Sequence, residues 1–201
     1  MSGKKIGFIK MNWSGGGLEN VVTTVANMMK EDMEMEPILI LNEEPRGKVP
    51  ACEIVNLNIG RVGNYPLKRH PVNMLRYVKQ MSSYFSALKK HVVKFGLDIV
   101  VALDLETVAL LKRLFKDIPV VVWIHLSLKG FWSRSGMWPF IKRGFELADA
   151  IIVLNKSMAD EISELCPSVK GKTFVIYNPI TIEPVSGMNR AESHRIVYIG
   201  R

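Results

Sequence analysis

Short apolar runs without polar alternation recur along this chain, and longer segments with helical periodicity separate them. In chain order, the runs cover residues 5–11, 37–41, 52–57, 98–103, 119–124, 150–154 and 173–176. A strand that is covered by helices on both faces has no solvent-facing side and therefore shows no alternation. Strands that alternate with helices pair in parallel, because a parallel pair needs a crossover connection. We therefore predict an α/β fold, a Rossmann-like doubly wound parallel sheet with helices on both faces.

The segments between these runs have apolar residues spaced by three and four, which is typical of amphipathic helices. The predicted helices cover residues 18–30, 71–95, 106–115, 137–147 and 156–165. The longest of them begins at Pro71 and stops before Gly96, and these residue types favour the first turn and the end of a helix.

The chain beyond residue 178 departs from the alternation. A linker-like stretch with Pro184 and Gly187 precedes a further predicted strand at residues 195–199. That strand is either the edge of the same sheet or the opening of another domain, and we favour the second. The predicted organisation is an N-terminal domain over residues 1–178, a linker over 179–193 and the first strand of a truncated C-terminal domain over 194–201.

Composition excludes several classes of protein. Cys52 and Cys166 are too few for a disulfide scaffold or a Cys-rich zinc site, and we expect both thiols to be reduced in a cytoplasmic protein. No apolar stretch approaches the roughly 20 residues of a membrane-spanning helix. The N-terminal apolar run is too short for a signal peptide. Neither a Walker loop, a metalloprotease motif nor metal-ligand spacing occurs, so we predict neither a metal nor a cofactor.

Basic residues are concentrated in two stretches that contain no Asp or Glu. Residues 54–97 carry eight Lys and Arg side chains, as many as the net charge of +8, and residues 118–145 carry four. Such stretches attract the phosphates of nucleic acid, anionic lipid or a nucleotide. They can equally form a solvated face that acids elsewhere in the fold balance.

A glycine loop, Ser14-Gly15-Gly16-Gly17, lies between the first predicted strand and helix. Glycines let backbone amides approach a phosphate or sugar, and the start of the helix adds partial positive charge. The dinucleotide fingerprint is only partly met, because its third glycine position holds Asn20. The loop is either a ligand-approach loop or a plain tight turn.

Two polar residues follow other predicted strands at the carboxyl edge, where parallel sheets bind ligands. His125 ends the strand 119–124 and either serves a structural role or contacts a sugar and stabilises charge. Asp104 follows the strand 98–103 and either binds hydroxyl groups or caps the next helix, with the cap slightly favoured. We expect His125 and the glycine loop to line the same open edge of the sheet.

A further candidate surface follows His125, where aromatic and basic residues interleave from residue 129 onward. It would form a lip for a lipid-linked acceptor or a membrane contact, or stack on single-stranded nucleic acid, or fold back onto the core. The residues singled out for this lip are Trp132, Arg134, Trp138, Lys142 and Arg143.

Taken together and in order, several short pieces of the chain resemble the N-terminal domain of retaining GT-B glycosyltransferases of family 4. The pieces are Ile6–Ile9, Gly15–Val22, Asp98–Val100, Val121–His125, Ala148–Asn155, Val175–Ile180 and Ile196–Arg201. Within that family, Trp123–Leu128 together with Ala102–Asp104 is most similar to bacterial lipopolysaccharide 1,6-galactosyltransferases.

The resemblance implies a transferase that moves a hexose from a nucleotide-sugar, expected to be a UDP-sugar, to a glycan or lipid-linked acceptor with retention of configuration. It also implies a second domain that holds most of the nucleotide, so we expect this chain alone to be inactive. In this sequence, Gly15–Gly17 would approach the donor phosphates and the acceptor, and His125 would be the catalytic residue beside the donor sugar. Asp104 and Ser127 would contact substrate.

Two alternatives stay open at this point. An NAD(P)-dependent Rossmann oxidoreductase is disfavoured by Asn20 and by the absence of a Tyr-x-x-x-Lys pair. A basic module that binds membranes or nucleic acid would explain the charge. The transferase hypothesis predicts no nucleic-acid partner. It does allow the basic helix 71–95 to dock on anionic lipid at the inner face of the plasma membrane.

Overall fold

A single parallel sheet organises the protein. The computed structural model describes residues 3–59 and 71–179. Its strands have the order β3-β2-β1-β4-β5-β6-β7, and every adjacent pair is parallel. The strands are β1 (Lys5–Lys10), β2 (Glu36–Leu41), β3 (Glu53–Asn56), β4 (Ile99–Ala102), β5 (Val120–Ile124), β6 (Ala150–Val153) and β7 (Thr173–Val175). The predicted α/β doubly wound architecture is confirmed.

Helices connect the strands and cover the sheet. The α-helices are α1 (Gly17–Asp32), α2 (Pro71–Phe95), α3 (Val108–Leu114), α4 (Phe131–Arg134), α5 (Trp138–Leu147) and α6 (Lys156–Leu165), and the 3-10 helices are η1 (Leu105–Thr107) and η2 (Pro167–Lys172). Within the described part of the chain, no helix is both long and apolar enough to cross a bilayer.

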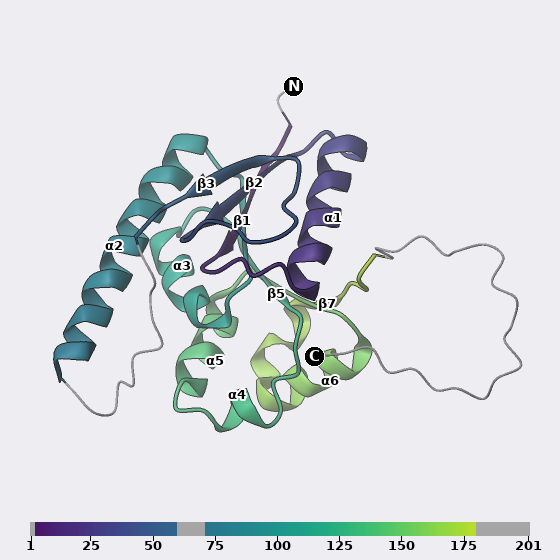
Figure 1. The fold of residues 1–201 in the computed structure, drawn as a ribbon. Coiled ribbons are helices and arrows are strands. Elements are labelled where there is room, and N and C mark those ends of the chain that lie inside the picture. Colours follow the sequence, from purple (N-terminus) through teal and green to yellow (C-terminus); the bar gives the residue numbers. More distant parts are fainter. Residues whose placement is uncertain (1–2, 60–70, 180–201) are drawn as a thin grey trace, which may run out of the picture.

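The two faces of the sheet build two separate cores. On β2, Leu39 and Leu41 belong to the core beneath α1, whereas Ile38 and Ile40 belong to the core beneath α2, α3 and α5. Figure 1 shows α1 on one side of the sheet and α2 and α3 on the other. Because both faces are buried, each strand needs apolar residues at successive positions, and this explains the missing alternation in the sequence.

Local predictions needed correction at two places. The helix expected over 106–115 begins as the 3-10 turn η1 and becomes α-helical only at Val108. The aromatic and basic stretch after His125, where the sequence predicts no helix before residue 137, contains the short helix α4. The predicted linker beyond Pro179 and the strand at 195–199 lie outside the described residues.

The order of the strands reverses between β1 and β4. The chain leaves β1 toward β2 on one side, whereas β4 and the later strands lie on the other side. The segments that leave the carboxyl ends of β1 and β4 therefore diverge to opposite sides. Doubly wound sheets bind ligands in the crevice that forms between such diverging segments. The glycine loop, Asp104 and His125 all follow strands at that edge.

The packing of α2 gives a stability prediction. Leu88 is fully buried against the sheet. Leu88→Ala should lower the free energy of unfolding by about 3 kcal/mol through lost burial and a residual cavity. The exposed neighbour Lys89 provides the control. Lys89→Ala should change the free energy of unfolding by less than about 0.5 kcal/mol. Urea unfolding measures both, and equal effects would show that α2 does not pack as described.

Candidate functional site

An ion pair joins the ends of β1 and β4 at the point where the strand order reverses. Lys10 closes β1 and Asp104 follows β4, and Lys10 Nζ lies 3.4 Å from Asp104 Oδ1. The other oxygen, Oδ2, accepts a 2.6 Å hydrogen bond from the backbone N–H of Met11. The favoured prediction that Asp104 caps the next helix is wrong in its detail. The carboxylate makes no capping bond, and only the backbone oxygen of Asp104 accepts from the Thr107 hydroxyl.

Glu19 extends this pair to the glycine loop. Its buried carboxylate accepts hydrogen bonds from the Gly16 N–H at 2.9 Å, the Ser14 N–H at 3.2 Å and the Ser14 hydroxyl at 3.1 Å. Oε1 of Glu19 also lies 4.0 Å from Lys10 Nζ. Lys10 therefore has a carboxylate from α1 on one side and Asp104 on the other, and Glu19 fixes the loop to the first turn of its own helix.

The charged form of Glu19 is favoured in this position. Burial alone would raise the pKa of its carboxyl group, but the hydrogen bonds from the backbone and from Ser14, together with the charge of Lys10, outweigh burial and lower the pKa. Glu19 is therefore ionised at neutral pH, and its negative charge offsets that of Lys10 inside the crevice.

The three glycines of the loop have different surroundings. Gly15 has φ +75°, and a Cβ there would lie 2.8 Å from the backbone oxygen of Arg46. The backbone conformation and the packing within the chain therefore explain a glycine at this position. The amide of Gly16 is occupied by Glu19. A Cβ added at Gly17 would meet no other atom within 4 Å. Of the three, Gly17 is therefore the one with open space for a ligand.

Gly17 and His125 line the same hollow at the carboxyl edge of the sheet. The hollow has a volume of about 520 Å³, and its lining residues are Gly17, Leu18, Asn20, Val21, His125, Leu126, Leu154 and Asn178. The expectation that the glycine loop and the histidine share one edge is confirmed for Gly17. Segments that follow β1, β5, β6 and β7 thus meet at one place.

His125 is held as a neutral imidazole. Its ring packs against Trp123 with centroids 4.6 Å apart. Burial and, to a lesser degree, the charge of Lys10 together lower the pKa of His125 to about 4, although the charge of Glu19 opposes the shift. Among the described residues, its buried Nε2 has no hydrogen-bond partner. A neutral imidazole offers one donor and one acceptor, which suits a sugar hydroxyl.

Ser127 is tied to α6. Its hydroxyl donates to both oxygens of Glu161 at 2.9 and 3.1 Å, and the backbone N–H of Lys129 donates to the same carboxylate. Glu161 is buried and thereby anchors the loop that follows His125. The hydroxyl proton of Ser127 is thus used within the protein.

The proposed aromatic and basic lip is split between α4 and α5. Trp138 is half-buried and packs edge-on against Phe145 at 6.3 Å, as expected if this aromatic folds back onto the core. Arg143 pairs with Glu146 at 3.0 Å. Arg134 is exposed and Lys142 half-exposed, and neither lines the hollow beside His125. The side chain of Trp132 lies outside the described residues.

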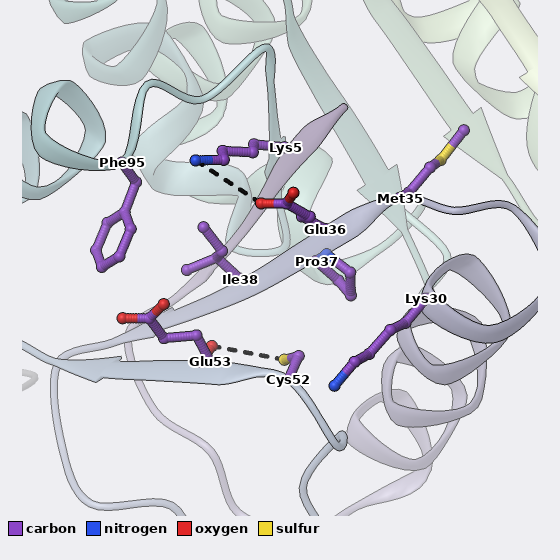
Figure 2. A pocket seen from close by; sticks show the side chains of 9 residues that line it. All are labelled: Lys5, Lys30, Met35, Glu36, Pro37, Ile38, Cys52, Glu53 and Phe95. Carbon is purple, nitrogen blue, oxygen red and sulfur yellow. Dashed lines mark hydrogen bonds and ion pairs between the residues drawn. The ribbon is translucent and has the colours of Figure 1, made fainter. Parts of the chain in front are cut away.

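A second hollow lies at the opposite edge of the sheet, where β1, β2 and β3 begin (Figure 2). Lys5 Nζ lies 3.7 Å from Glu36 Oε2 across it, and Cys52 contacts the backbone oxygen of Glu53. Burial raises the pKa of the Cys52 thiol to about 11, so the thiol is protonated and unreactive at neutral pH. Parallel sheets bind ligands at their carboxyl edge, and we therefore place the candidate site beside His125.

Sequence reasoning missed Lys10, Glu19 and Glu161. A signal existed for Glu19, because it stands three residues after Gly16, at the position of the acidic partner in a capping box. Lys10 is a charge at the end of an apolar run, which marks a strand end but not its partners. Nothing in the local pattern links Glu161 to Ser127, since α6 is more than 30 residues away in sequence.

Residues 15–184 match the family model described as Glycosyltransferase Family 4. The match covers most of the chain and contains Gly15–Gly17, Asp104 and His125. This chain belongs to glycosyltransferase family 4. The sequence-based resemblance is thereby confirmed, and the fold is that of the N-terminal half of a GT-B glycosyltransferase.

Solved structures share the fold of this family 4 chain at low identity. The lipopolysaccharide outer core galactosyltransferase WaaB has 18% identity and a TM-score of 0.63, covering 90% of this chain and 47% of its own. Sucrose-phosphate synthase from Thermosynechococcus elongatus has 14% identity and a TM-score of 0.65, covering 87% and 48%. Anabaena HepE in complex with UDP and glucose has 16% identity and a TM-score of 0.55, covering 87% and 44%.

This family 4 chain spans about half the length of each of these proteins. No curated protein matches its sequence.

The link between Glu19 and His125 can be measured. Glu19→Gln removes the charge that raises the pKa of His125, so the imidazole pKa should fall further below its value of about 4. Losing charge-assisted bonds to the loop should also lower the free energy of unfolding by about 2 kcal/mol. NMR titration of the imidazole and urea unfolding check these effects. Glu31→Gln, an exposed change on the same helix, should alter neither. An unchanged His125 titration in Glu19→Gln would contradict the link.

The buried imidazole also predicts how stability depends on pH. His125 has a lowered pKa of about 4 in the folded protein and 6.5 when unfolded, so between these values the unfolded chain binds the extra proton. The free energy of unfolding should therefore fall as the pH drops from about 6.5 to 4. His125→Asn should remove this part of the slope. Thermal unfolding of both proteins across this pH range tests the prediction. If the stability of wild type and of His125→Asn changed equally with pH, the lowered pKa of His125 would be excluded.

Proposed function

We propose that this family 4 chain is the acceptor-side half of a hexosyltransferase. The reaction moves a hexose from a nucleotide-sugar, a UDP-sugar, to a glycan or lipid-linked acceptor with retention of anomeric configuration. The observation that carries the proposal is the shared hollow of Gly17 and His125 at the carboxyl edge, within the segment that matches the family. HepE, which is seen with UDP and glucose, and the galactosyltransferase WaaB support a UDP-hexose donor.

The chemistry of the hollow suits a departing diphosphate and a charged sugar. Cleaving the bond between the hexose and its phosphate develops negative charge on the diphosphate, and oriented backbone amides at the start of α1 stabilise such charge without reorganising. Gly17 lines the hollow, whereas Glu19 already occupies the amide of Gly16, so the Gly17 amide is the one that would meet the diphosphate.

His125 would act as the catalytic residue by orienting the hexose through a hydrogen bond. A group with a pKa of about 4 is unprotonated at neutral pH, so a role as proton donor is disfavoured. The imidazole lines the hollow and would instead form a hydrogen bond with a sugar hydroxyl. The half-buried imidazole and the surrounding apolar residues would keep water away from the reacting carbon.

Asp104 and Ser127 would contact the acceptor from the neighbouring strand ends. An ionised carboxylate has about four acceptor positions, and Lys10 and Met11 use two of those on Asp104. A hydroxyl of the acceptor would take a remaining one. Ser127 keeps its oxygen lone pairs for the same purpose, since its proton goes to Glu161.

We further propose that the protein works in the cytoplasm, peripherally at the inner face of the plasma membrane, in building a bacterial lipopolysaccharide or capsule. The proposal includes neither metal, cofactor nor nucleic acid. The two acid-free basic stretches support contact with anionic lipid. Because the chain spans about half of its structural relatives, transfer would require a second domain, and this chain would bind substrates without turnover.

A paired glycine variant tests the proposal. NMR of the isotope-labelled chain during titration with UDP-glucose, UDP-galactose and NAD, in buffer with EDTA, detects even millimolar binding. The UDP-sugars should shift the signals of Gly17 and His125, and NAD should not. Gly17→Val should abolish these shifts without lowering the melting temperature, because a Cβ there meets no other atom within 4 Å. Gly136→Val, equally unhindered and away from the hollow, should bind normally.

Three outcomes would refute the proposed function. The first is an absence of shifts at millimolar UDP-sugar, and the second is a response confined to the hollow where β1, β2 and β3 begin. The third is equal binding by Gly17→Val and wild type. Shifts caused by NAD alone would favour the oxidoreductase alternative.

A further inference from the structure

A further concave surface shares no lining residue with the hollow of His125. This apolar groove has a volume of about 380 Å³ and is lined by Val78, Met81, Glu106, Leu110, Met137 and Phe140. The lining comes from α2, η1, α3, α5 and the residue before α5, and Figure 1 shows α2, α3 and α5 on the same face of the sheet. Glu106 is the charged residue of this lining, so the groove suits an apolar ligand.

Two exposed side chains form part of the groove. Val78 is 54% exposed and Met137 is 36% exposed, whereas Met81 is buried. Large apolar side chains with this much exposure cost hydrophobic free energy that an apolar ligand would recover. The groove is thus a surface on which a chain of methylene groups would be removed from water.

The charge around the groove selects the kind of apolar ligand. Four of its six lining residues lie in the two acid-free stretches, residues 54–97 and 118–145, which this groove brings together. Exposed or half-exposed cations on the same segments include Lys79, Arg134 and Lys142. An amphiphile with an anionic head would therefore meet cations carried by the same segments that supply the apolar lining.

One lining residue, Glu106, links the groove along the chain to Asp104 of the candidate site. Glu106 lies in the 3-10 turn directly after Asp104, and the charges of Asp104 and Lys10 both act on its carboxyl group. Burial raises the pKa of the Glu106 carboxyl group. A ligand that contacts Glu106 would thus contact the segment that begins at Asp104, the residue proposed to bind acceptor hydroxyls.

We propose that this groove binds the alkyl chain of an anionic, lipid-linked acceptor, with its phosphate among the cations of α2, α4 and α5 and its sugar toward Asp104. The inference rests on the proposed function and names the class of acceptor that this chain would take. It assigns the apolar selectivity to Val78, Met81, Leu110, Met137 and Phe140, none of which lines the hollow of His125.

Soluble alkyl phosphates test the groove directly. The affinities of the 201-residue chain for octyl phosphate, decyl phosphate and inorganic phosphate are compared by calorimetry or NMR. Both alkyl phosphates are kept below their critical micelle concentrations. Each buried methylene contributes about 0.8 kcal/mol, so decyl phosphate should bind roughly tenfold more tightly than octyl phosphate. Inorganic phosphate should bind too weakly to measure, and the shifted signals should include Val78, Leu110 and Met137.

A matched pair of variants on α2 locates the binding. Val78→Asp places a charge in the groove and should weaken decyl phosphate binding at least tenfold. Val93→Asp makes the same change at a site on α2 that is 69% exposed and outside the groove, and it should leave binding unchanged. Should Val78→Asp fold poorly, Met137→Gln on the opposite wall serves the same purpose, since that residue is also exposed.

Several results would overturn the inference. They are affinity independent of chain length, equal weakening by both aspartate variants, and tight binding of inorganic phosphate alone. Sedimentation with anionic phospholipid vesicles measures binding of the chain to a bilayer separately. Vesicle binding that Val78→Asp abolishes, without any binding of decyl phosphate, would identify the groove as a bilayer contact instead.

The same titrations separate this inference from the proposed function. Loss of alkyl phosphate binding with intact UDP-sugar shifts at Gly17 and His125 would remove only the acceptor groove. Alkyl phosphate binding without any UDP-sugar response would instead count against the transferase.

Discussion

The ion pair between Lys10 and Asp104 is the contact on which the arrangement of the site depends. It ties the carboxyl ends of β1 and β4 together where the strand order reverses and the connecting segments diverge. Without Asp104, the Met11 amide would lose its hydrogen-bond acceptor and Lys10 would be left with the more distant carboxylate of Glu19. Glu19 completes the arrangement, because it neutralises the same lysine and holds the glycine loop.

This network also controls which groups remain for a ligand. The carboxylate of Glu19 uses the Gly16 amide and the Ser14 hydroxyl, so the open part of the loop begins at Gly17. The charges of Lys10 and Glu19 act on His125 with opposite sign, and burial then keeps the imidazole neutral. One cluster of charges therefore holds the loop and also modulates the pKa of His125, which burial dominates.

Much of the site followed from its place at the ends of strands. A histidine after a continuous apolar strand and glycines between a strand and a helix had to lie at the carboxyl edge, and Gly17 and His125 meet there. The role of Asp104 was harder to predict, because a helix cap is a local interaction whereas its actual partners, Lys10 and Met11, lie more than 90 residues earlier. The same reason hides Glu161, whose partner Ser127 gives no local signal.

The sequence by itself determined the class of fold, because burial on both faces forces continuous apolar strands and helical periodicity separates them. It also determined which residues end those strands. Only the tertiary structure decided which charges pair across the sheet, which loop amides stay open, and that two acid-free stretches meet at one apolar groove. Periodicity is a local property of the chain, whereas these contacts depend on the order in which the strands lie side by side.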